Sequence, residues 1–175
     1  MDIIGQYRIA APREVVWAAL NDPDVLRRCI PGCRELDRKS DTEFTAKVTL
    51  KIGPMNANFT GAVTLQDLNP PESYTIAGQG QGGAAGFAKG SAEVKLTPDA
   101  DHTILDYTAK ADVGGKLASL GSRLIQATSK KLADEFFSKF AAEVGGEEEP
   151  AAAEEAPAAE PKQSRWKKWL GLSRA

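Results

Sequence analysis

The sequence is poor in the residues that build metal sites and disulfide frameworks. Among its 175 residues are two cysteines and one histidine. Cys29 and Cys33 are separated by three residues, and a tetrahedral zinc site would need further soft ligands. We therefore predict no metal site and two free thiols, the default in a reducing compartment.

Long apolar runs and a large excess of one charge are also missing. No stretch approaches the roughly 20 apolar residues that cross a bilayer. The first ten residues contain an acid, Asp2, and no unbroken apolar run, which argues against a signal peptide. The net charge of −2 offers no broad positive surface to a nucleic-acid backbone. These features predict a cytoplasmic chain that neither spans a membrane nor binds nucleic acid.

Motifs of catalysis and nucleotide binding are absent or lie in the wrong context. Residues 78–83 match G-x-G-x-x-G, but another strand is predicted after them, where a dinucleotide fingerprint requires a helix. No G-x-S-x-G elbow is present, and the single His102 falls in a predicted turn over residues 98–102. We therefore predict that the chain is not an enzyme and has no catalytic residues.

Apolar residues recur with two different periods along residues 1–145. A period near two predicts strands at residues 3–9, 44–52, 57–68, 73–82, 87–97 and 103–113. Pro12 and the Asp22-Pro23 pair suit the starts of two short helices after the first strand. After residue 115 the period becomes helical and predicts one long amphipathic helix. This order predicts an α+β domain, with a curved antiparallel sheet of about seven strands around the long C-terminal helix.

Small residues fall on the predicted concave face of the later strands. They are Gly78, Gly80, Gly82, Ala88, Gly90, Ala92, Ala109 and Ala111. Protein interiors are close-packed, so the missing volume has to be filled by the facing helix or by a ligand. One interpretation is an apolar ligand pocket. The other is close approach of the helix, with Leu117, Leu120 and Leu124 filling the space.

The residues beyond 145 differ in composition from the rest of the chain. Residues 146–161 contain six Glu and no basic residue, which predicts a flexible Ala/Pro/Glu linker. Residues 162–175 contain five Lys and Arg and no acid, which predicts docking on an anionic membrane surface. Docking on an acidic protein and a solubilised end without a function are the alternatives. The predicted docking residues are Arg165, Trp166, Lys167, Lys168, Trp169, Leu170 and Leu172.

Several segments together resemble the carbon monoxide dehydrogenase G-subunit family, within the START-like (SRPBCC) helix-grip superfamily. They are Trp17 and Leu20, residues 29–33 (CIPGC), 51–54 (KIGP), 59–61 (FTG), 86–90 (GFAKG) and 114–125 (GGKLASLGSRLI). The resemblance covers about residues 1–144. It implies a helix-grip ligand-binding domain at residues 1–145 with a large apolar cavity. It also implies a partner, a molybdenum hydroxylase such as carbon monoxide dehydrogenase, that carries out the chemistry.

The resemblance and the tail together predict a carrier on the inner face of the cell membrane. Its ligand would be a respiratory quinone, menaquinone or ubiquinone, bound without a covalent cofactor and handed to the electron-transport chain. The predicted lining is Trp17, Phe59, Tyr74, Phe87, Tyr107, Leu117, Leu120 and Leu124, with Tyr107 as the polar handle. One alternative is a recruitment or assembly adaptor with no ligand. Another is a polyketide cyclase or hydrolase, which would require inward-pointing acidic or histidine side chains.

Overall fold

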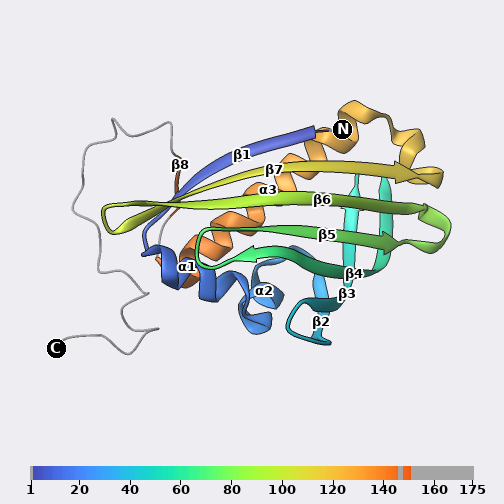
Figure 1. Ribbon diagram of the computed structural model, residues 1–175. Coiled ribbons are helices and arrows are strands. Elements are labelled where there is room, and N and C mark those ends of the chain that lie inside the picture. Colours follow the sequence, from blue (N-terminus) through green and yellow to red (C-terminus); the bar gives the residue numbers. More distant parts are fainter. Residues whose placement is uncertain (1, 146–147, 151–175) are drawn as a thin grey trace.

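Strands with alternating apolar residues make up most of the part of the chain that the structure describes, residues 2–145 and 148–150. The computed structural model arranges them in one sheet (Figure 1). The strands are β1 (Asp2–Ile9), β2 (Cys33–Arg38), β3 (Glu43–Ile52), β4 (Met55–Asn69), β5 (Ser73–Gln81), β6 (Phe87–Asp99), β7 (His102–Gly114) and β8 (Glu148–Pro150). The helices are α1 (Arg13–Leu20), α2 (Pro23–Cys29) and α3 (Ser122–Val144), with two 3-10 helices, η1 (Gly83–Ala85) and η2 (Gly115–Leu120).

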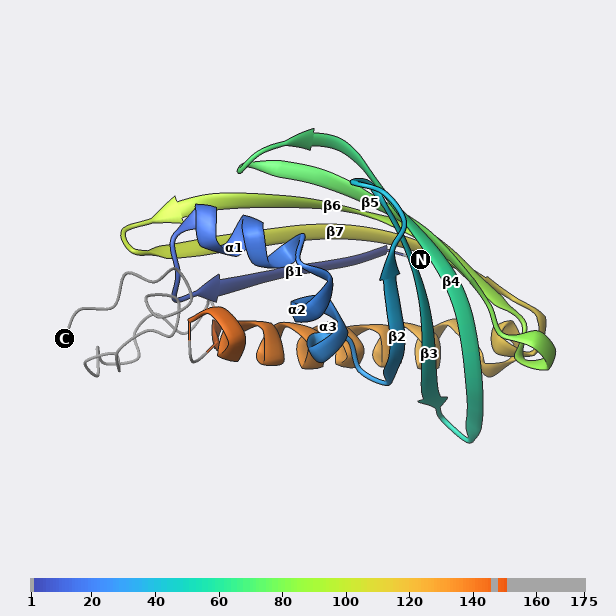
Figure 2. The same cartoon turned by 90° about the horizontal axis from the view of Figure 1, so that it is seen from below.

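Neighbouring strands of the sheet are antiparallel, in the order β2-β3-β4-β5-β6-β7-β1-β8. Strands β2 to β7 form a meander, and β1 lies beside β7. The sheet is strongly bent, and α3 runs along its concave side (Figure 2). This arrangement confirms the predicted fold class, including the two short helices after the first strand. The short strand β8 was not predicted.

The two short helices begin where their sequences favour it. The Asp22 side chain accepts a hydrogen bond of 2.9 Å from the N–H of Asp24, and Pro23 is the first residue of α2. This is the cap that the Asp-Pro pair predicted. Pro12 is the N-cap of α1 and has an extended conformation, so the helix begins one residue after the predicted start.

The long helix begins later than its apolar spacing indicated. Residues 115–120 form the 3-10 helix η2, and Gly121 has a φ of 92°. This left-handed backbone conformation favours glycine and interrupts a regular helix. The helix α3 therefore starts at Ser122, and Leu117 and Leu120 precede it.

Two strand assignments also differ from the prediction. The segment Cys33–Arg38 forms β2, with an irregular register between Cys33 and Glu35 that obscures the period. The β6–β7 turn lies at residues 100–101, where Ala100 has a φ of 56°. His102 is therefore the first residue of β7, opposite Asp99, and lies outside the turn.

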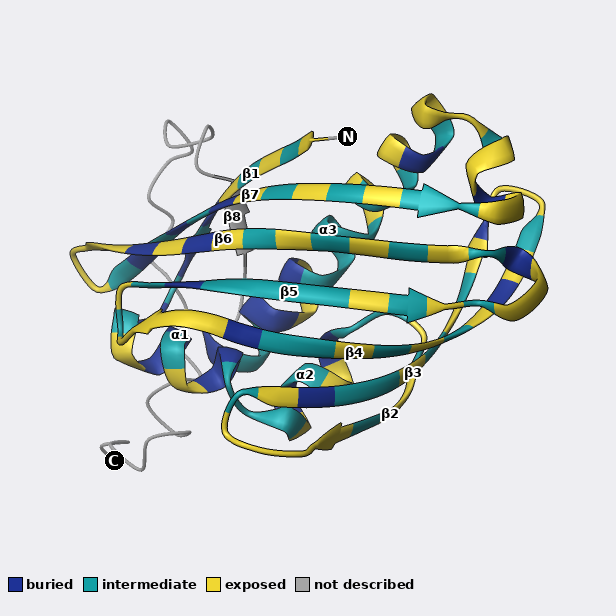
Figure 3. Ribbon diagram, turned by 45° about the vertical axis from the view of Figure 1, so that its right-hand side comes forward, coloured by how far each residue is buried: buried dark blue, intermediate teal, exposed yellow. Residues whose placement is uncertain are grey.

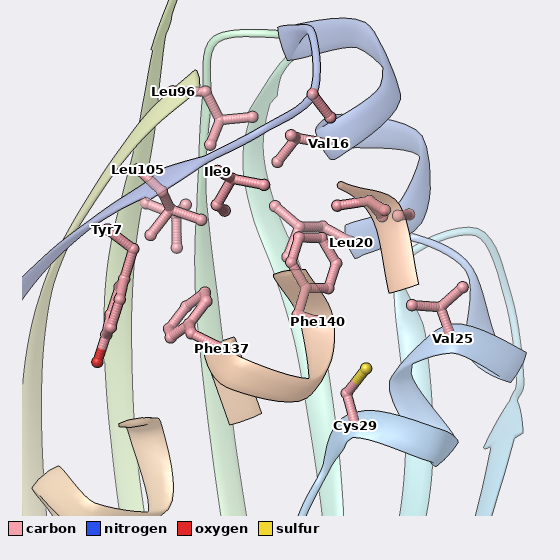
Figure 4. Packing of buried hydrophobic residues seen from close by; sticks show 14 of the residues in the cluster. Tyr7, Ile9, Val16, Leu20, Val25, Cys29, Leu96, Leu105, Phe137 and Phe140 are labelled. Atoms are coloured by element: carbon pink, nitrogen blue, oxygen red, sulfur yellow. The ribbon is translucent and has the colours of Figure 1, made fainter. Parts of the chain in front are cut away.

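The core is divided into two clusters of buried apolar residues. The larger cluster joins α1, α2 and the C-terminal half of α3 to one end of the sheet, around Phe140 (Figure 4). The smaller cluster has three buried members, Ile52, Leu117 and Ile125, which come from β3, η2 and the start of α3. The two ends of α3 thus pack against different parts of the sheet. No described helix is long and apolar enough to cross a membrane.

Candidate ligand-binding hollow

Beside the larger cluster, the concave face of the sheet carries rows of residues in register, most of them small, and Ile3, Ile76 and Ala109 of the first row pack against that cluster. One row runs Ile76, Ala92, Ala109 and Ile3 across β5, β6, β7 and β1, and the next runs Gly78, Gly90 and Ala111. We call the space over these seven residues the hollow. The predicted phase of the small residues in these three strands is confirmed by the register.

The residues that line the hollow are less buried than the inward-facing residues two positions further along the same strands. The adjoining row, Tyr74, Val94 and Tyr107, is at most 7% exposed, whereas all seven lining residues are half-buried. Figure 3 shows this change along β6 and β7, where buried residues gather towards α1. A Cβ added to Gly78 would have only Ala62 and Val63 of β4 within 4 Å. The helix therefore does not fill the space over Gly78.

The side of α3 that faces the sheet also contributes to both clusters. Ile125 belongs to the smaller cluster, and Phe137 and Phe140 belong to the larger one. Between them, Thr128 and Leu132 are half-buried and are members of neither cluster. The buried side chains of α3 thus lie on either side of Thr128 and Leu132, which are only half-buried.

Three stacked aromatic rings of the larger cluster border the hollow. Tyr7 stacks on Phe137 with ring centroids 4.4 Å apart, and Tyr107 lies 5.8 Å from Phe137 at an interplanar angle of 20°. The Tyr7 hydroxyl points away from Ile9 and Leu105 in Figure 4 and donates a hydrogen bond to Asp134 of α3. The apolar wall thus carries polar atoms at one edge.

The two tyrosine hydroxyls differ in their bonding. Burial, followed by the hydrogen bond to Asp134, raises the pKa of Tyr7. The Tyr107 hydroxyl is buried and has no hydrogen-bond partner among the described residues. Burial raises the pKa of Tyr107 and outweighs the neighbouring Tyr7 hydroxyl, which lowers it, so the Tyr107 hydroxyl stays protonated. A buried donor without a partner is rare in native structures and requires an explanation, such as a ligand.

Asp134 is the acidic group beside this wall. Burial raises its pKa, but hydrogen bonds from Lys130, at 2.8 Å, and from Tyr7 outweigh this effect and lower it. The carboxylate is therefore ionised near neutral pH. Because both donors hold it, it is not poised as a general base.

The structure separates the predicted lining residues into groups. Trp17, Tyr74 and Tyr107 belong to the larger cluster, where Trp17 and Tyr74 meet edge to face at 5.1 Å. Phe59, Leu117 and Leu120 belong to the smaller cluster. These six residues therefore lie at the two ends of the hollow.

Leu124 and Phe87 lie elsewhere. Leu124 reaches the β3–β4 hairpin, where a Cβ added to Gly53 would come within 2.8 Å of its side chain. Phe87 does not face the hollow: its side chain is 40% exposed and shares the convex face with Gly114, its partner in β7. The reason is strand phase, since Ala88 next to it faces inward.

Tyr7, Asp134 and Ile3 were not among the predicted site residues. Tyr7 and Ile3 share the inward phase of β1, and this signal could have identified both as candidates. Asp134 gives no such signal, because a charged residue in an amphipathic helix is expected on the solvent side. Its contact with Tyr7 joins residues far apart in the chain and depends on how α3 docks.

Two surface depressions lie close to the hollow. One, of about 460 Å³, is on the opposite face of the sheet over β4 to β7; its lining includes Gln79, Lys89 and Asp112, and also Gly78 and Gly90, which have no side chain to cover that face. The other, of about 400 Å³, lies between β1 and α3 and includes Ile3 in its lining. Because Ile3 also belongs to the hollow, this second depression adjoins it.

The cysteines are free thiols, as predicted. Cys29 is buried, and burial raises its pKa to about 11. Among the described residues, no three His, Cys, Asp or Glu side chains are grouped so that they could hold a metal ion. The predicted docking residues 165–172 lie outside the residues that the structure describes.

A bent antiparallel sheet around a long C-terminal helix, with two short helices after the first strand, defines the START-like helix-grip class. Within this class, the sequence pattern of CoxG, the G-subunit family of carbon monoxide dehydrogenase, matches residues 5–145. The chain therefore belongs to the CoxG family. The match excludes residues 146–175. No protein with a curated function is recognisably similar to the chain in sequence.

Solved structures agree with this assignment of the fold. A conserved protein from Geobacillus kaustophilus has a TM-score of 0.76 and 31% identity, over 81% of this chain and 93% of that one. An aromatase/cyclase from a Streptomyces species has a TM-score of 0.62 and 15% identity, over 82% and 92%. A norcoclaurine synthase from Thalictrum flavum has a TM-score of 0.55 and 14% identity, over 81% and 93%. At such low identity, the two enzymes show a common fold only.

Proposed function

We propose that this chain is a non-catalytic carrier that binds a respiratory quinone in the hollow. In this proposal it links a molybdenum hydroxylase of the carbon monoxide dehydrogenase type to the membrane electron-transport chain. Membership of the CoxG family supports the choice of partner. The observation that carries the ligand role is the half-buried concave face, bordered by the unpaired hydroxyl of Tyr107.

The chemistry of the hollow suits a long apolar molecule with a polar ring. Its lining is aliphatic or glycine, so burial of an isoprenoid chain gains about 25 cal/mol for each Å² removed from water. The hydroxyl of Tyr107 can donate a hydrogen bond to a quinone oxygen at the aromatic end. The ligand would thus place its ring beside Tyr7 and Tyr107 and its tail along Gly78, Gly90 and Ala111.

A carrier fits the polar groups of the hollow better than an enzyme does. The carboxylate that faces the aromatic wall, Asp134, already accepts hydrogen bonds from Tyr7 and Lys130. Glu93 and Asp112 are exposed residues on the outward phase of β6 and β7. In the proposal, oxidation and reduction therefore take place on the cofactors of the partner.

The tail supplies the proposed membrane contact. Tryptophan favours the headgroup region, and each basic residue near an anionic leaflet contributes about 1 kcal/mol. The acidic linker 146–161 would give the domain reach from a peripheral position on the cytoplasmic face. An adaptor role without a ligand requires the same tail, so the tail alone does not distinguish the two functions.

Native mass spectrometry of the full chain, purified from quinone-containing membranes, tests the ligand role. We expect a stoichiometric adduct with the mass of menaquinone or ubiquinone, released by solvent extraction. A protein that stays empty after incubation with either quinone would leave only the adaptor function.

A further inference from the structure

Three neighbouring segments form one end of the domain. They are the β3–β4 hairpin (residues 51–56), the β5–β6 connection with η1 (residues 81–89) and the stretch from β7 through η2 to the start of α3 (residues 112–123). Their inward side chains contribute to the smaller cluster, and a Cβ added to Gly115 would come within 2.7 Å of the Cα of Gly86. Figure 2 shows the three segments at the right. We call them the η end.

The η end carries an excess of positive charge. Its charged residues are four basic ones and one acid, namely Lys51, Lys89, Lys116, Arg123 and Asp112. All five are exposed, and none of them forms an ion pair with another described residue. Asp2 lines the same depression as Arg123 and adds a second acid, but Lys110 lies directly opposite Asp2 in β7. The excess of three positive charges is therefore unchanged.

The turns at the other end of the same strands carry the opposite charge. The β4–β5 turn, residues 66–73, and the β6–β7 turn, residues 98–102, contain four acids and no Lys or Arg. One of these acids, Asp99, is paired with Arg8. Figure 2 shows both turns at the left. Because a charge distribution of this kind orients a protein in an external field, an anionic surface would attract the η end and repel the turns.

The η end also exposes small and apolar side chains. Pro54, Ala84 and Ala118 are exposed, one in each segment. The ring of Phe87 is 40% exposed and lies over Gly114. Basic side chains beside exposed apolar ones are the combination that binds the interface of an anionic bilayer.

We propose that the η end docks directly on an anionic membrane surface, as a contact separate from the tail. The choice of a lipid surface over an acidic protein rests on the proposed function, in which the ligand comes from the bilayer. Ala88 and Val113 of the η end follow Gly90 and Ala111 of the hollow along the same strands. Docking in this orientation would thus bring one end of the hollow to the headgroups, while the tail holds the domain nearby.

Hydrogen exchange of the full chain, followed by mass spectrometry with and without lipid vesicles, tests this docking. We expect vesicles that contain anionic lipid to protect peptides covering residues 51–56, 81–89 and 112–123. Vesicles of neutral lipid should not protect them. Peptides covering residues 66–73 and 98–102 should exchange at the same rate in all samples. An η end without protection, whether or not the chain floats with anionic vesicles, would overturn the proposal.

A matched pair of double variants tests the basic residues. K51Q/K116Q should lower the affinity of the full chain for anionic vesicles about thirtyfold, because two basic residues near the leaflet are lost. K131Q/K139Q removes the same charge from exposed positions of α3 and should leave the affinity nearly unchanged. Equal losses in the two double variants would show a general effect of net charge and overturn the proposal.

Two further outcomes separate this contact from its alternatives. Protection of the η end by a purified carbon monoxide dehydrogenase, but not by anionic vesicles, would assign this end to a protein partner and overturn the proposal. Quinone binding is read separately by native mass spectrometry. An η end that vesicles protect in a chain that never carries quinone would support the membrane contact and contradict only the carrier function.

Discussion

The ring of Tyr107 lies across Gly5, its partner in the neighbouring strand β1. A Cβ at residue 5 would overlap the ring and its hydroxyl oxygen. Gly5 thus allows the stacked wall of Tyr7, Tyr107 and Phe137 to form at the border of the hollow.

Substitution of Gly5 by Ala should destabilise the fold. The added methyl group forces Tyr107 out of the stack, and overpacking of this kind typically costs about 1–3 kcal/mol. Urea unfolding followed by tyrosine and tryptophan fluorescence measures the change. G80A is the matched control, because its Cβ would find its nearest neighbour in Phe59 at 3.8 Å. A control variant as unstable as G5A would show that the ring contact is not the cause.

Removal of the Tyr107 hydroxyl should affect binding more than stability. Y107F deletes a buried donor that has no partner among the described residues, so the free energy of unfolding should stay the same or rise. Quinone affinity should fall about fivefold, which corresponds to the loss of one hydrogen bond of ~1 kcal/mol. Fluorescence titration with a short-chain quinone measures the affinity. Unchanged affinity would remove Tyr107 as the polar handle.

Asp134 should make stability depend on pH on the acid side. Its pKa is lowered below the ordinary 3.8 in the folded protein, so its stabilising effect is present above that value and is lost as the pH falls through the folded pKa. The side chain is half exposed, so the effect should be below ~1 kcal/mol. The stability difference between the unmodified chain and D134N should therefore shrink between about pH 5 and pH 2. A difference that stays constant over this range would contradict the assignment.

A larger side chain in the hollow should block the ligand. A111L places a leucine in the second row of the hollow without replacing a glycine, and A62L adds the same volume on the exposed convex face of β4. We expect A111L to lose the quinone adduct in native mass spectrometry and A62L to keep it. Both variants should remain folded by circular dichroism. An adduct of full intensity in A111L would place the ligand elsewhere.

The membrane contact should depend on the tail tryptophans. W166A/W169A should reduce flotation with vesicles containing anionic lipid, because two indoles leave the headgroup region. The domain, with its quinone adduct, should be unaffected. Vesicles of neutral lipid provide the control for the basic residues. Unchanged flotation of the double variant would eliminate the two tryptophans as the anchor.

Period-two patterns were sufficient to predict which side the small residues occupy. Gly78, Gly90 and Ala111 are inward because strand phase is a local property, and the register brings them into one row. Phe87 was included among the lining residues for its size, although the alternation along β6 puts its side chain on the outward face. The apolar spacing of Leu117, Leu120 and Leu124 fits a helix, and only the φ of Gly121 separates η2 from α3.

Properties that depend on tertiary docking were not predictable from the pattern. The bond between Tyr7 and Asp134 requires the exact position of α3 against β1. That Leu117 and Leu120 close one end of the sheet, and do not fill its middle, also follows from this position. A residue list chosen for apolar character therefore identified the ends of the hollow and missed much of its floor.

The unequal sizes of the two clusters give the protein a weak end and a strong end. Among the described residues, the cluster that joins the β3–β4 hairpin to η2 and the start of α3 has three buried members, with partly buried residues such as Leu50 and Phe59 packed against them. Such a small contact can open locally while Phe140 and its neighbours stay packed, because opening free energies vary across a structure. In the proposed carrier, this end of the sheet would open at a lower cost in free energy than the end around Phe140.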